Sequence, residues 1–377
     1  MDLALSEIQQ MLKTSAREVL ARECPFEVVR EMEGDPMGYT PDLWRSMAEL
    51  GWMGLVVPEE YGGAGGSFLD LGMLLEEMGR ALTPGPFFST VVLGALTVMD
   101  AGDEALQSKL LPGIARGETL MTLAVTEESG GYSPEEIRLQ AERREGEYVL
   151  SGRKFFVPDA HVADYAIVAA RTSEGADAWD GITLFVVPMK KGGVVVTSHA
   201  TMALEKQAQV EFDEVRVGVD SVVGAVDKGW PALEGAIARA ATAKGLEMVG
   251  GAEAALEMTL EYLKDRVQFG RPVGTFQALQ HHCANMAIDV EGSRYAAYQA
   301  AYRISEGLPA RREVSVAKAW VSDAYMRVCA TAVQCHGAVG FTEEHNLQLF
   351  TRRARVQEQM YGDGGFHRRR LAEGLRG

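Results

Sequence analysis

The sequence lacks the features that would indicate a nucleic-acid or membrane partner. Its 377 residues contain 37 Lys and Arg against 53 Asp and Glu, which gives a formal net charge of -16. This excess of negative charge leaves no broad cationic surface to attract phosphate backbones or anionic lipids. No apolar run approaches the roughly 20 residues that a membrane-spanning helix needs. We therefore expect neither nucleic acid nor a membrane as a partner.

Cysteine is scarce, and the first residues do not have the pattern of a secretion signal. The chain opens with acidic residues and no basic segment before an apolar stretch, so a cytoplasmic location is expected. No two cysteines form a C-x-x-C pair, and Cys335 with its neighbour His336 lacks the spacing of a zinc site. We expect reduced, structural thiols and no metal. The four cysteines are Cys24, Cys283, Cys329 and Cys335.

Length and periodicity predict a multi-domain α+β protein. A chain of 377 residues exceeds the size at which one hydrophobic core keeps growing, so two or three domains are expected. Over residues 1–119 the apolar residues recur with a helical period, and Thr40 before Pro41 is a helix start, so an N-terminal helical domain is predicted. Over residues 227–377 the helical period returns and predicts an antiparallel four-helix bundle.

The central stretch, residues 120–226, has a different pattern. Short β-rich runs alternate with turn residues, which is typical of a small β-sandwich or barrel. The polar stretch 172–181 is predicted to be a hairpin loop. The predicted strands are Met121–Val125, Tyr148–Ser151, Lys154–Val157, Tyr165–Ala170, Ile182–Val187, Gly193–Val196 and Val210–Val215.

Two motifs in the C-terminal segment have residue types that suit a phosphorylated ligand. The run DRVQFGRPVGTFQ from Asp265 to Gln277 contains an arginine, whose planar guanidinium donates charge-assisted hydrogen bonds to phosphates. The run QCHGAVGF from Gln334 to Phe341 contains glycines, which allow close approach of the backbone to a ligand. Taken alone, the arginine could simply end a helix, where a cation is favourable.

The order of the three segments and these motifs resemble the acyl-CoA dehydrogenase family. The first run is similar to the family's Arg-x-x-Phe-Gly…Gln signature and the second to its Gln-x-x-Gly-Gly-x-Gly run. In the central segment, LAVTEESGG resembles the flavin-lining Thr-Glu stretch, and GRKFFVP resembles Gly-x-Lys-x-Trp-Ile-Thr. The resemblance implies FAD as cofactor, an acyl-CoA substrate, a homo- or heterotetramer and an electron-transfer protein as acceptor.

The resemblance also implies roles for individual residues. The C-terminal motifs would serve the FAD of a neighbouring subunit, and the central stretch would line the flavin. Two positions depart from the family pattern: Phe156 replaces the usual Trp, and Pro158 replaces a Thr that contacts the flavin. Phenylalanine can still stack, whereas proline offers neither a hydroxyl nor an N–H. The expected cofactor-binding residues are Val125, Thr126, Phe156, Arg266, Phe269, Gln277, Gln334 and Gly337.

The family reaction needs a carboxylate near the α-carbon of the thioester, with a pKa raised by desolvation. In the alignment, the usual glutamate position holds Tyr361. The pKa of tyrosine, ~10, would have to fall by about three units, at a cost of roughly 4 kcal/mol, for it to act as a base at neutral pH. Tyr361 is therefore a poor base and a better hydrogen-bond donor.

Other positions offer alternatives for the base. A second site used in the family, on the helix before the arginine motif, holds Ala240. Glu247 is on the same helix face but about two turns further, roughly 10 Å along the axis, and is expected to be solvated or paired in the bundle. Asp363 could act if its glycine-containing loop is re-routed. Its alternative is a turn aspartate that binds its own backbone.

Two functions remain open. In the first, the chain is an active FAD enzyme that oxidises an acyl-CoA to the 2,3-enoyl-CoA with Asp363 as base. In the second, it is a non-catalytic partner in a hetero-oligomer and lends FAD contacts to another chain. Family members that act on bulky CoA esters form such mixed assemblies, and this chain resembles their less complete subunits.

Overall fold

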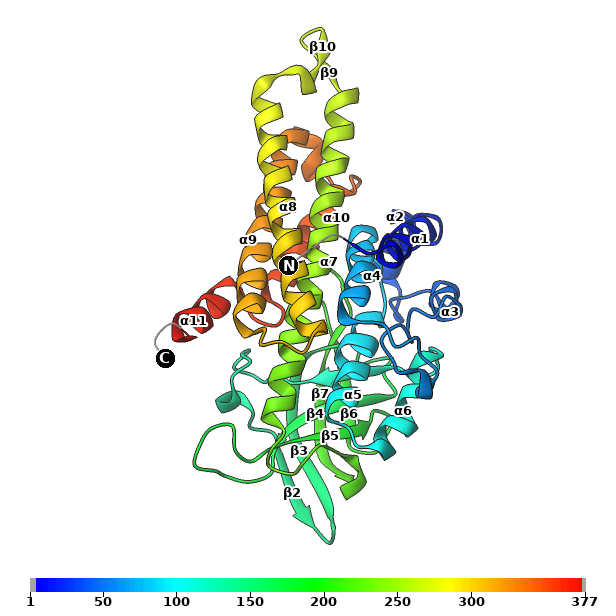
Figure 1. Cartoon of the computed structure of the whole chain (residues 1–377), viewed down its shortest axis with the longest axis vertical. Helices are drawn as coiled ribbons and strands as arrows, with labels where there is room; N and C mark the ends of the chain where they lie inside the picture. Colours follow the sequence, from blue (N-terminus) through cyan, green and yellow to red (C-terminus); the bar gives the residue numbers. More distant parts are fainter. Residues whose placement is uncertain (1–4, 375–377) are drawn as a thin grey trace. The chain divides into compact units, whose positions relative to one another are not determined.

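The computed structural model describes residues 5–374, which form two compact units (Figure 1). The first unit contains the described residues up to Arg30, the segment Phe68–Thr83 and the described residues from Ala241 onward. The second unit contains Glu31–Ser67 and Pro84–Ala240. Each unit therefore combines segments that are far apart in the sequence. The predicted domain boundaries at residues 119 and 226 stay a prediction.

The first unit is helical. Helix α1 begins at a capping box in which Ser6 accepts from the Gln9 N–H. Helix α1 packs on α4, α4 on α8, and α8, α10 and α11 all pack on α9. The helices are α1 (Glu7–Glu23), α4 (Phe68–Ala81), α8 (Gln277–Ser305), α9 (Arg311–His336), α10 (Leu347–Gln359) and α11 (Gly364–Gly374), with the part of α7 (Trp230–Asp265) that follows Ala240 and part of α2 (Phe26–Gly34).

Glycines allow the backbones of α4 and α7 to approach closely. A Cβ at Gly79 would collide with the carbonyl oxygen of Glu247, and a Cβ at Gly250 would collide with that of Glu76. Glycine therefore lies on both helices where they cross, although it lowers helix propensity by about 1 kcal/mol relative to alanine. This contact fixes the part of α7 that carries Glu247 against α4.

The second unit is built around one sheet. The strand order is β6-β7-β3-β2-β4-β5-β8, and β1 pairs with β4. Within residues 5–374 the sheet ends at β6 and β8 and does not close into a barrel. The strands are β1 (Met121–Ala124), β2 (Gln140–Arg144), β3 (Glu147–Pro158), β4 (Tyr165–Arg171), β5 (Ile182–Pro188), β6 (Val194–His199), β7 (Gln207–Val217) and β8 (Val222–Val223).

Helices complete the second unit. Thr40 caps α3, accepting from the Leu43 N–H at 3.2 Å, and Pro41 occupies the first helical position as predicted. A π-helical segment, η2, continues directly into α5. The elements are α3 (Pro41–Glu49), η2 (Phe88–Ala95), α5 (Leu96–Ala101), α6 (Glu104–Ala115) and short 3-10 turns at Glu59–Tyr61, Pro134–Glu136 and Val219–Ser221.

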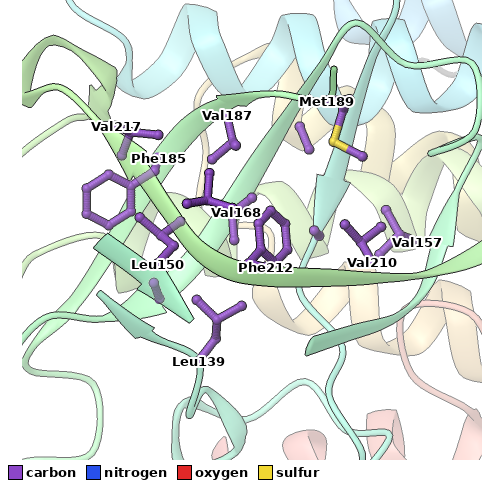
Figure 2. Close-up of a cluster of buried hydrophobic side chains, with 14 of the residues drawn as sticks. Leu139, Leu150, Val157, Val168, Phe185, Val187, Met189, Val210, Phe212 and Val217 are labelled. Carbon is purple, nitrogen blue, oxygen red and sulfur yellow. The ribbon is translucent and has the colours of Figure 1, made fainter. Parts of the chain in front are cut away.

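A cluster of buried side chains from the sheet forms a core of the second unit (Figure 2). Leu150 and Phe212 come from the paired strands β3 and β7, and Val168 and Phe185 from the paired strands β4 and β5. All four are almost completely buried. The Tyr148 and Phe185 rings lie 5.0 Å apart in a tilted arrangement. This core supports the strands that carry the predicted flavin-side residues.

The predicted fold class is confirmed, with differences in the strands. The two predicted runs Tyr148–Ser151 and Lys154–Val157 are parts of a single strand, β3, whose register against β7 shifts twice. Strand β2 was not predicted, because four of its five residues are exposed and mostly charged. The predicted hairpin loop at 172–181 connects the antiparallel strands β4 and β5.

Three further findings concern the described residues. None of the helices between residues 5 and 374 is both long and apolar enough to cross a membrane. No group of three or more His, Cys, Asp and Glu side chains in that range is arranged to hold a metal ion. All four cysteines are free thiols.

Candidate functional site

The arginine motif forms an exposed hairpin between α7 and α8 (Figure 1). Its strands, β9 (Val267–Gln268) and β10 (Arg271–Pro272), are joined by Phe269 and Gly270, which both have positive φ, +55° and +77°. Two positive φ values at the centre of a two-residue loop are the hairpin turn that favours glycine. A bulky phenylalanine there is strained, and strain of this kind is found at functional positions. The Phe269 side chain is 90% exposed.

The other motif residues lie at the base of this hairpin. The Arg266 N–H donates to the Tyr262 carbonyl at 2.9 Å, and its own carbonyl accepts from the Val273 N–H at 2.8 Å. These bonds fix the Arg266 backbone and leave the side chain exposed. The Phe276 ring packs under the turn, 5.9 Å from the Phe269 ring. Gln277, the first residue of α8, is also exposed.

The second motif lies at the same end of the first unit. The Tyr262 ring, one turn before Arg266, stacks on His336 at 4.4 Å, and its hydroxyl donates to the His336 carbonyl at 3.2 Å. Gly337 follows with φ +64° and ψ -140°, a conformation essentially restricted to glycine. Gln334 and Gly337 are both exposed. The structure therefore brings the predicted residues of the two motifs together.

The exposed set at this end suits a phosphorylated, aromatic ligand. Arg266 supplies a guanidinium for phosphate oxygens, Phe269 an apolar ring, and Gln277 and Gln334 amide groups. Gly337 presents backbone without a side chain. A chain that exposes nearly all of an aromatic ring gains free energy when a partner molecule covers it. These residues fit a cofactor held against this end from outside the subunit.

In the second unit, the predicted flavin-side residues lie on two adjacent segments. Val125 and Thr126 directly follow β1 and are buried. The Phe155 N–H on β3 donates to the Thr126 carbonyl at 2.8 Å, which ties the two segments together. Phe156 has φ +52° at the register shift of β3, and its ring is 56% exposed, 6.0 Å from the His199 ring. The positive φ is a second strained aromatic position.

A buried ion pair holds this segment. Lys154 is fully buried, and its Nζ donates to the Val125 carbonyl at 3.0 Å and to Glu127 Oε1 at 2.7 Å. The same oxygen accepts from the N–H groups of Arg138 and Leu139. Burial lowers the pKa of Lys154 to about 8, and Glu127 opposes this effect. The motifs alone did not predict this pair, although a lysine inside an apolar strand was a visible signal.

Pro158, at the end of β3, has its carbonyl bound by the Thr122 hydroxyl at 2.6 Å. It pairs with Gln207 of β7. As expected from its residue type, it offers no hydroxyl and no N–H at the position that the resemblance aligns with a flavin-contacting threonine. The departure therefore removes a hydrogen-bond donor from the predicted flavin side.

In the first unit, Tyr361 lies in the loop between α10 and α11. It is 7% exposed and has φ +57°, and the next residue, Gly362, has φ +97°. Asp363 caps α11: its Oδ1 accepts from the Phe366 N–H at 2.6 Å. One carboxylate oxygen of Asp363 is thus used by the helix, in agreement with the turn alternative. Its role as a base stays a prediction.

Buried polar groups surround this loop. Lys318 of α9 is fully buried and lies 3.0 Å from the Gly362 carbonyl. On α7, Lys244 Nζ lies 2.5 Å from Glu247 Oε2, and Gln357 of α10 donates to the same oxygen at 3.4 Å. Glu247 is thus paired in the bundle, as expected. Lys318 was not predicted, although a lysine between Ala317 and Ala319 in a buried helix was a visible signal.

Comparison with known proteins covers the whole length of the chain. Three family models match in order: the acyl-CoA dehydrogenase N-terminal domain over residues 6–118, the middle domain over 122–215 and the C-terminal domain over 227–376. A probable acyl-CoA dehydrogenase of Bacillus subtilis (strain 168), YngJ, is 30% identical, and the alignment covers 98% of each chain.

Solved structures show the same likeness. Butyryl-CoA dehydrogenase from Megasphaera elsdenii has a TM-score of 0.93 and 28% identity, with all of both chains covered. A chain in the ChsE4-ChsE5 complex from Mycobacterium tuberculosis has a TM-score of 0.91 and 29% identity, covering 100% of this chain and 99% of that one.

Proposed function

Because the chain belongs to the acyl-CoA dehydrogenase family, whose members are oxidoreductases acting on CH–CH groups and generally depend on FAD, we propose that it is a subunit of an FAD-dependent enzyme that converts an acyl-CoA thioester to the 2,3-enoyl-CoA. The observation that carries the proposal is the exposed end formed by the two C-terminal motifs. Arg266 and Phe269 lie there with Gly337, joined through the stacked Tyr262 and His336.

Several residues would hold the cofactor. Arg266, Phe269, Gln277 and Gln334 would bind the phosphate and adenosine part of an FAD that belongs to a neighbouring subunit, as their exposure supports. Val125, Thr126 and Phe156 would line the flavin side of this subunit. FAD, when bound, supplies the acceptor for the hydride that leaves the β-carbon.

The proton at the α-carbon requires a base on the protein, and we propose Asp363. Its Oδ1 accepts from the Phe366 N–H, so Oδ2 is the oxygen that would receive the proton. Asp363→Asn keeps an oxygen for the helix cap and removes only the charge. We expect this variant to bind FAD normally and to lose substrate-dependent flavin bleaching by about 100-fold or more.

A matched control distinguishes the base from a general loss of charge. Asp177→Asn changes an exposed aspartate in the loop between β4 and β5 and should leave flavin bleaching unchanged. If Asp363→Asn bleaches its flavin at the wild-type rate, Asp363 is not the base.

Specific observations favour a second function, a non-catalytic partner subunit of a hetero-oligomer. The resemblance aligns Tyr361 and Ala240 with the two positions of the family's glutamate, and Pro158 with a flavin-side threonine whose hydroxyl it lacks. One solved relative is part of a two-protein complex, ChsE4-ChsE5. In this function the exposed motif residues serve another chain's FAD, and the chain's own flavin side is unused.

An exposed apolar face on α8 and α9 supports assembly in either function. Ile288 and Tyr295 are 67% and 53% exposed, and they lie on one face of α8 with Gly292 between them. Trp320 of α9 is 43% exposed and lies against Gly292. A contiguous apolar face of this kind is typical of a protein interface. We propose that it contributes to a homo- or heterotetramer.

One experiment separates the two functions. The chain is purified alone, its flavin content and oligomeric mass are measured, and both are measured again after co-expression with a homologous chain. Stoichiometric FAD that an acyl-CoA reduces in the homo-oligomer supports the enzyme and rules out the partner role. FAD that appears only with the second chain supports the partner role.

A further inference from the structure

Lys318 makes an unusual set of contacts for a lysine inside a helix bundle. Its Nζ lies 3.2 Å from the Gln357 carbonyl, 2.9 Å from that of Glu358 and 3.0 Å from that of Gly362. It also donates to the Ser322 hydroxyl at 3.1 Å on its own helix. The side chain has no exposed surface. A cation is costly to bury because it loses its hydration, so hydrogen bonds must compensate for the lost water.

The carbonyls that Lys318 binds belong to one short segment. Gln357 and Glu358 are in the last turn of α10, whose final carbonyls have no partner within the helix. Gly362 lies in the loop that follows. One ammonium group thus bridges the end of α10 and the loop, with Tyr361 held between the bound carbonyls.

The loop has a strained shape that needs support. Tyr361 has φ +57°, a conformation that is strained for a non-glycine residue, and Gly362 follows with φ +97°. His367 of α11 supports the other side, with its Nε2 3.1 Å from the Tyr361 carbonyl. Burial and the nearby Lys318 charge lower the pKa of His367 to about 3, so the ring is neutral and its Nε2–H donates.

We propose that Lys318 is a positioning residue: its ammonium group binds three carbonyls of the segment Gln357–Gly362 and thereby holds Tyr361 in its left-handed conformation, so that the loop is a preformed wall of the acyl-CoA site. The last part rests on the proposed function, since it assigns this loop to substrate binding. The clamp itself depends only on the contacts of Lys318.

The groups around Lys318 act on its charge in opposite directions. Burial, together with Lys244 of α7, lowers the pKa of Lys318 to about 7, and Glu358 of α10 and Asp363 of the loop oppose this effect. On α11, His367 is neutral and adds no charge. The ammonium form has three N–H donors for four acceptors, the three carbonyls and the Ser322 hydroxyl, so two of these acceptors share one donor. A methionine at this position has similar length and no donor, and would leave those carbonyls buried without a partner.

The test is hydrogen exchange of the backbone amides of residues 360–366, measured by mass spectrometry on the full chain. For Lys318→Met we expect exchange in this segment to rise by about tenfold or more, because three buried hydrogen bonds are lost, while distant helices keep their protection. The matched control is Lys154→Met, a second fully buried lysine, which lies in the other unit. It should leave exchange in residues 360–366 at the wild-type rate. Unchanged exchange in folded Lys318→Met would overturn the proposal.

A measurement on the wild-type chain covers the case in which Lys318→Met does not fold. An amine-reactive reagent labels Lys318 only when its buried group becomes exposed, so its labelling should follow the same opening as amide exchange in residues 360–366. If these amides exchange at least about tenfold more often than Lys318 becomes accessible, the loop opens without the lysine and the clamp is refuted.

A binding measurement distinguishes positioning from plain stability and from failure of the proposed function. In the FAD-loaded enzyme, Lys318→Met should raise the Kd for an acyl-CoA about tenfold or more at a temperature where the variant is fully folded. Thr40→Ala, which removes the cap of α3 and lies outside the proposed binding residues, sets the effect of lost stability alone. If the wild-type chain binds no acyl-CoA, the proposed function fails, and the exchange data still decide whether Lys318 holds the loop. If it binds and Lys318→Met binds equally well, the loop is no wall of the site.

Discussion

The ion pair between Glu127 and Lys154 gives a prediction whose size can be worked out from the structure. Glu127 Oε1 accepts from Lys154 Nζ at 2.7 Å and from the N–H groups of Arg138 and Leu139 at 2.9 and 3.0 Å. The Lys154 side chain is fully buried, and that of Glu127 is 12% exposed. Glu127→Ala therefore leaves a buried ammonium without its counter-ion and two N–H groups without their acceptor.

Removing one partner of a buried pair costs about 3–5 kcal/mol. We expect Glu127→Ala to lower the free energy of unfolding by that amount. Glu127→Gln keeps an acceptor oxygen and loses only the charge, so its cost should be smaller, about 1–3 kcal/mol. The double variant Glu127→Ala/Lys154→Met removes the stranded charge. It should be less destabilised than the sum of the two single variants by about 2 kcal/mol.

The assay is urea unfolding of the wild-type chain and of the four variants Glu127→Ala, Glu127→Gln, Lys154→Met and Glu127→Ala/Lys154→Met, followed by circular dichroism and by FAD content. Because Lys154 also binds the Val125 carbonyl, the variants should lose FAD more readily than their melting temperatures alone would explain. Strict additivity of the single variants in the double variant would refute the reasoning, since it would mean that the two groups do not interact. A loss below about 0.5 kcal/mol in Glu127→Ala would refute it as well, because that is the range of ordinary surface substitutions.

Two further predictions concern the first unit. The Glu76 carboxylate is fully buried. It lies 2.8 Å from Lys13 Nζ, 3.0 Å from Arg294 Nε and 2.5 Å from the Tyr298 hydroxyl. Burial raises its pKa, but the charges of Lys13 and Arg294 outweigh this effect, so the pKa of Glu76 is lowered. The stability that ionised Glu76 supplies should be complete above its unfolded pKa of about 4.3, and it should be lost as the pH falls through the lower pKa of the folded state. Glu76→Gln should remove this acid dependence in urea unfolding at about pH 3–7. Gly250→Ala places a methyl group against the Glu76 carbonyl and should cost about 2 kcal/mol or more in urea unfolding, whereas Gly245→Ala, on the same helix with open space around it, should be neutral or stabilising.

The sequence predicted the order of helices, sheet and helices because its apolar residues keep clear periods. Strand β2 was missed for the opposite reason. Its residues Gln140–Arg144 are mostly exposed and charged, and they pair through the backbone with β3, which no side-chain pattern reveals. The break assigned between Ser151 and Lys154 was wrong because Gly152, with φ +144°, continues the strand where its register shifts.

For the site, motifs located the residues, and the structure supplied how they are held. The spacing of Arg266, Phe269 and Gln277 could be matched to the family. That Phe269 is in a left-handed turn and almost fully exposed depends on the hairpin geometry, which the motif does not encode. Lys154 and Lys318 were missed, since lysine in an apolar run predicts a surface position unless the partners that pair with it are known.

The two buried lysines also bear on the choice between enzyme and partner subunit. Lys154 fixes the segment that would line the flavin, and Lys318 fixes the loop that carries Tyr361. A fully buried cation is costly to keep, and an apolar residue of the same volume is often as stable or more so. If both segments served no ligand, nothing in the proposed function would require a buried cation to hold them in one conformation. Both lysines are nevertheless present, and their acceptors are well placed. This is easier to explain if the chain binds its own flavin and its own acyl-CoA. The two buried lysines therefore favour the catalytic function despite Tyr361 and Pro158. The flavin content of the chain purified alone is the measurement that decides between the two functions.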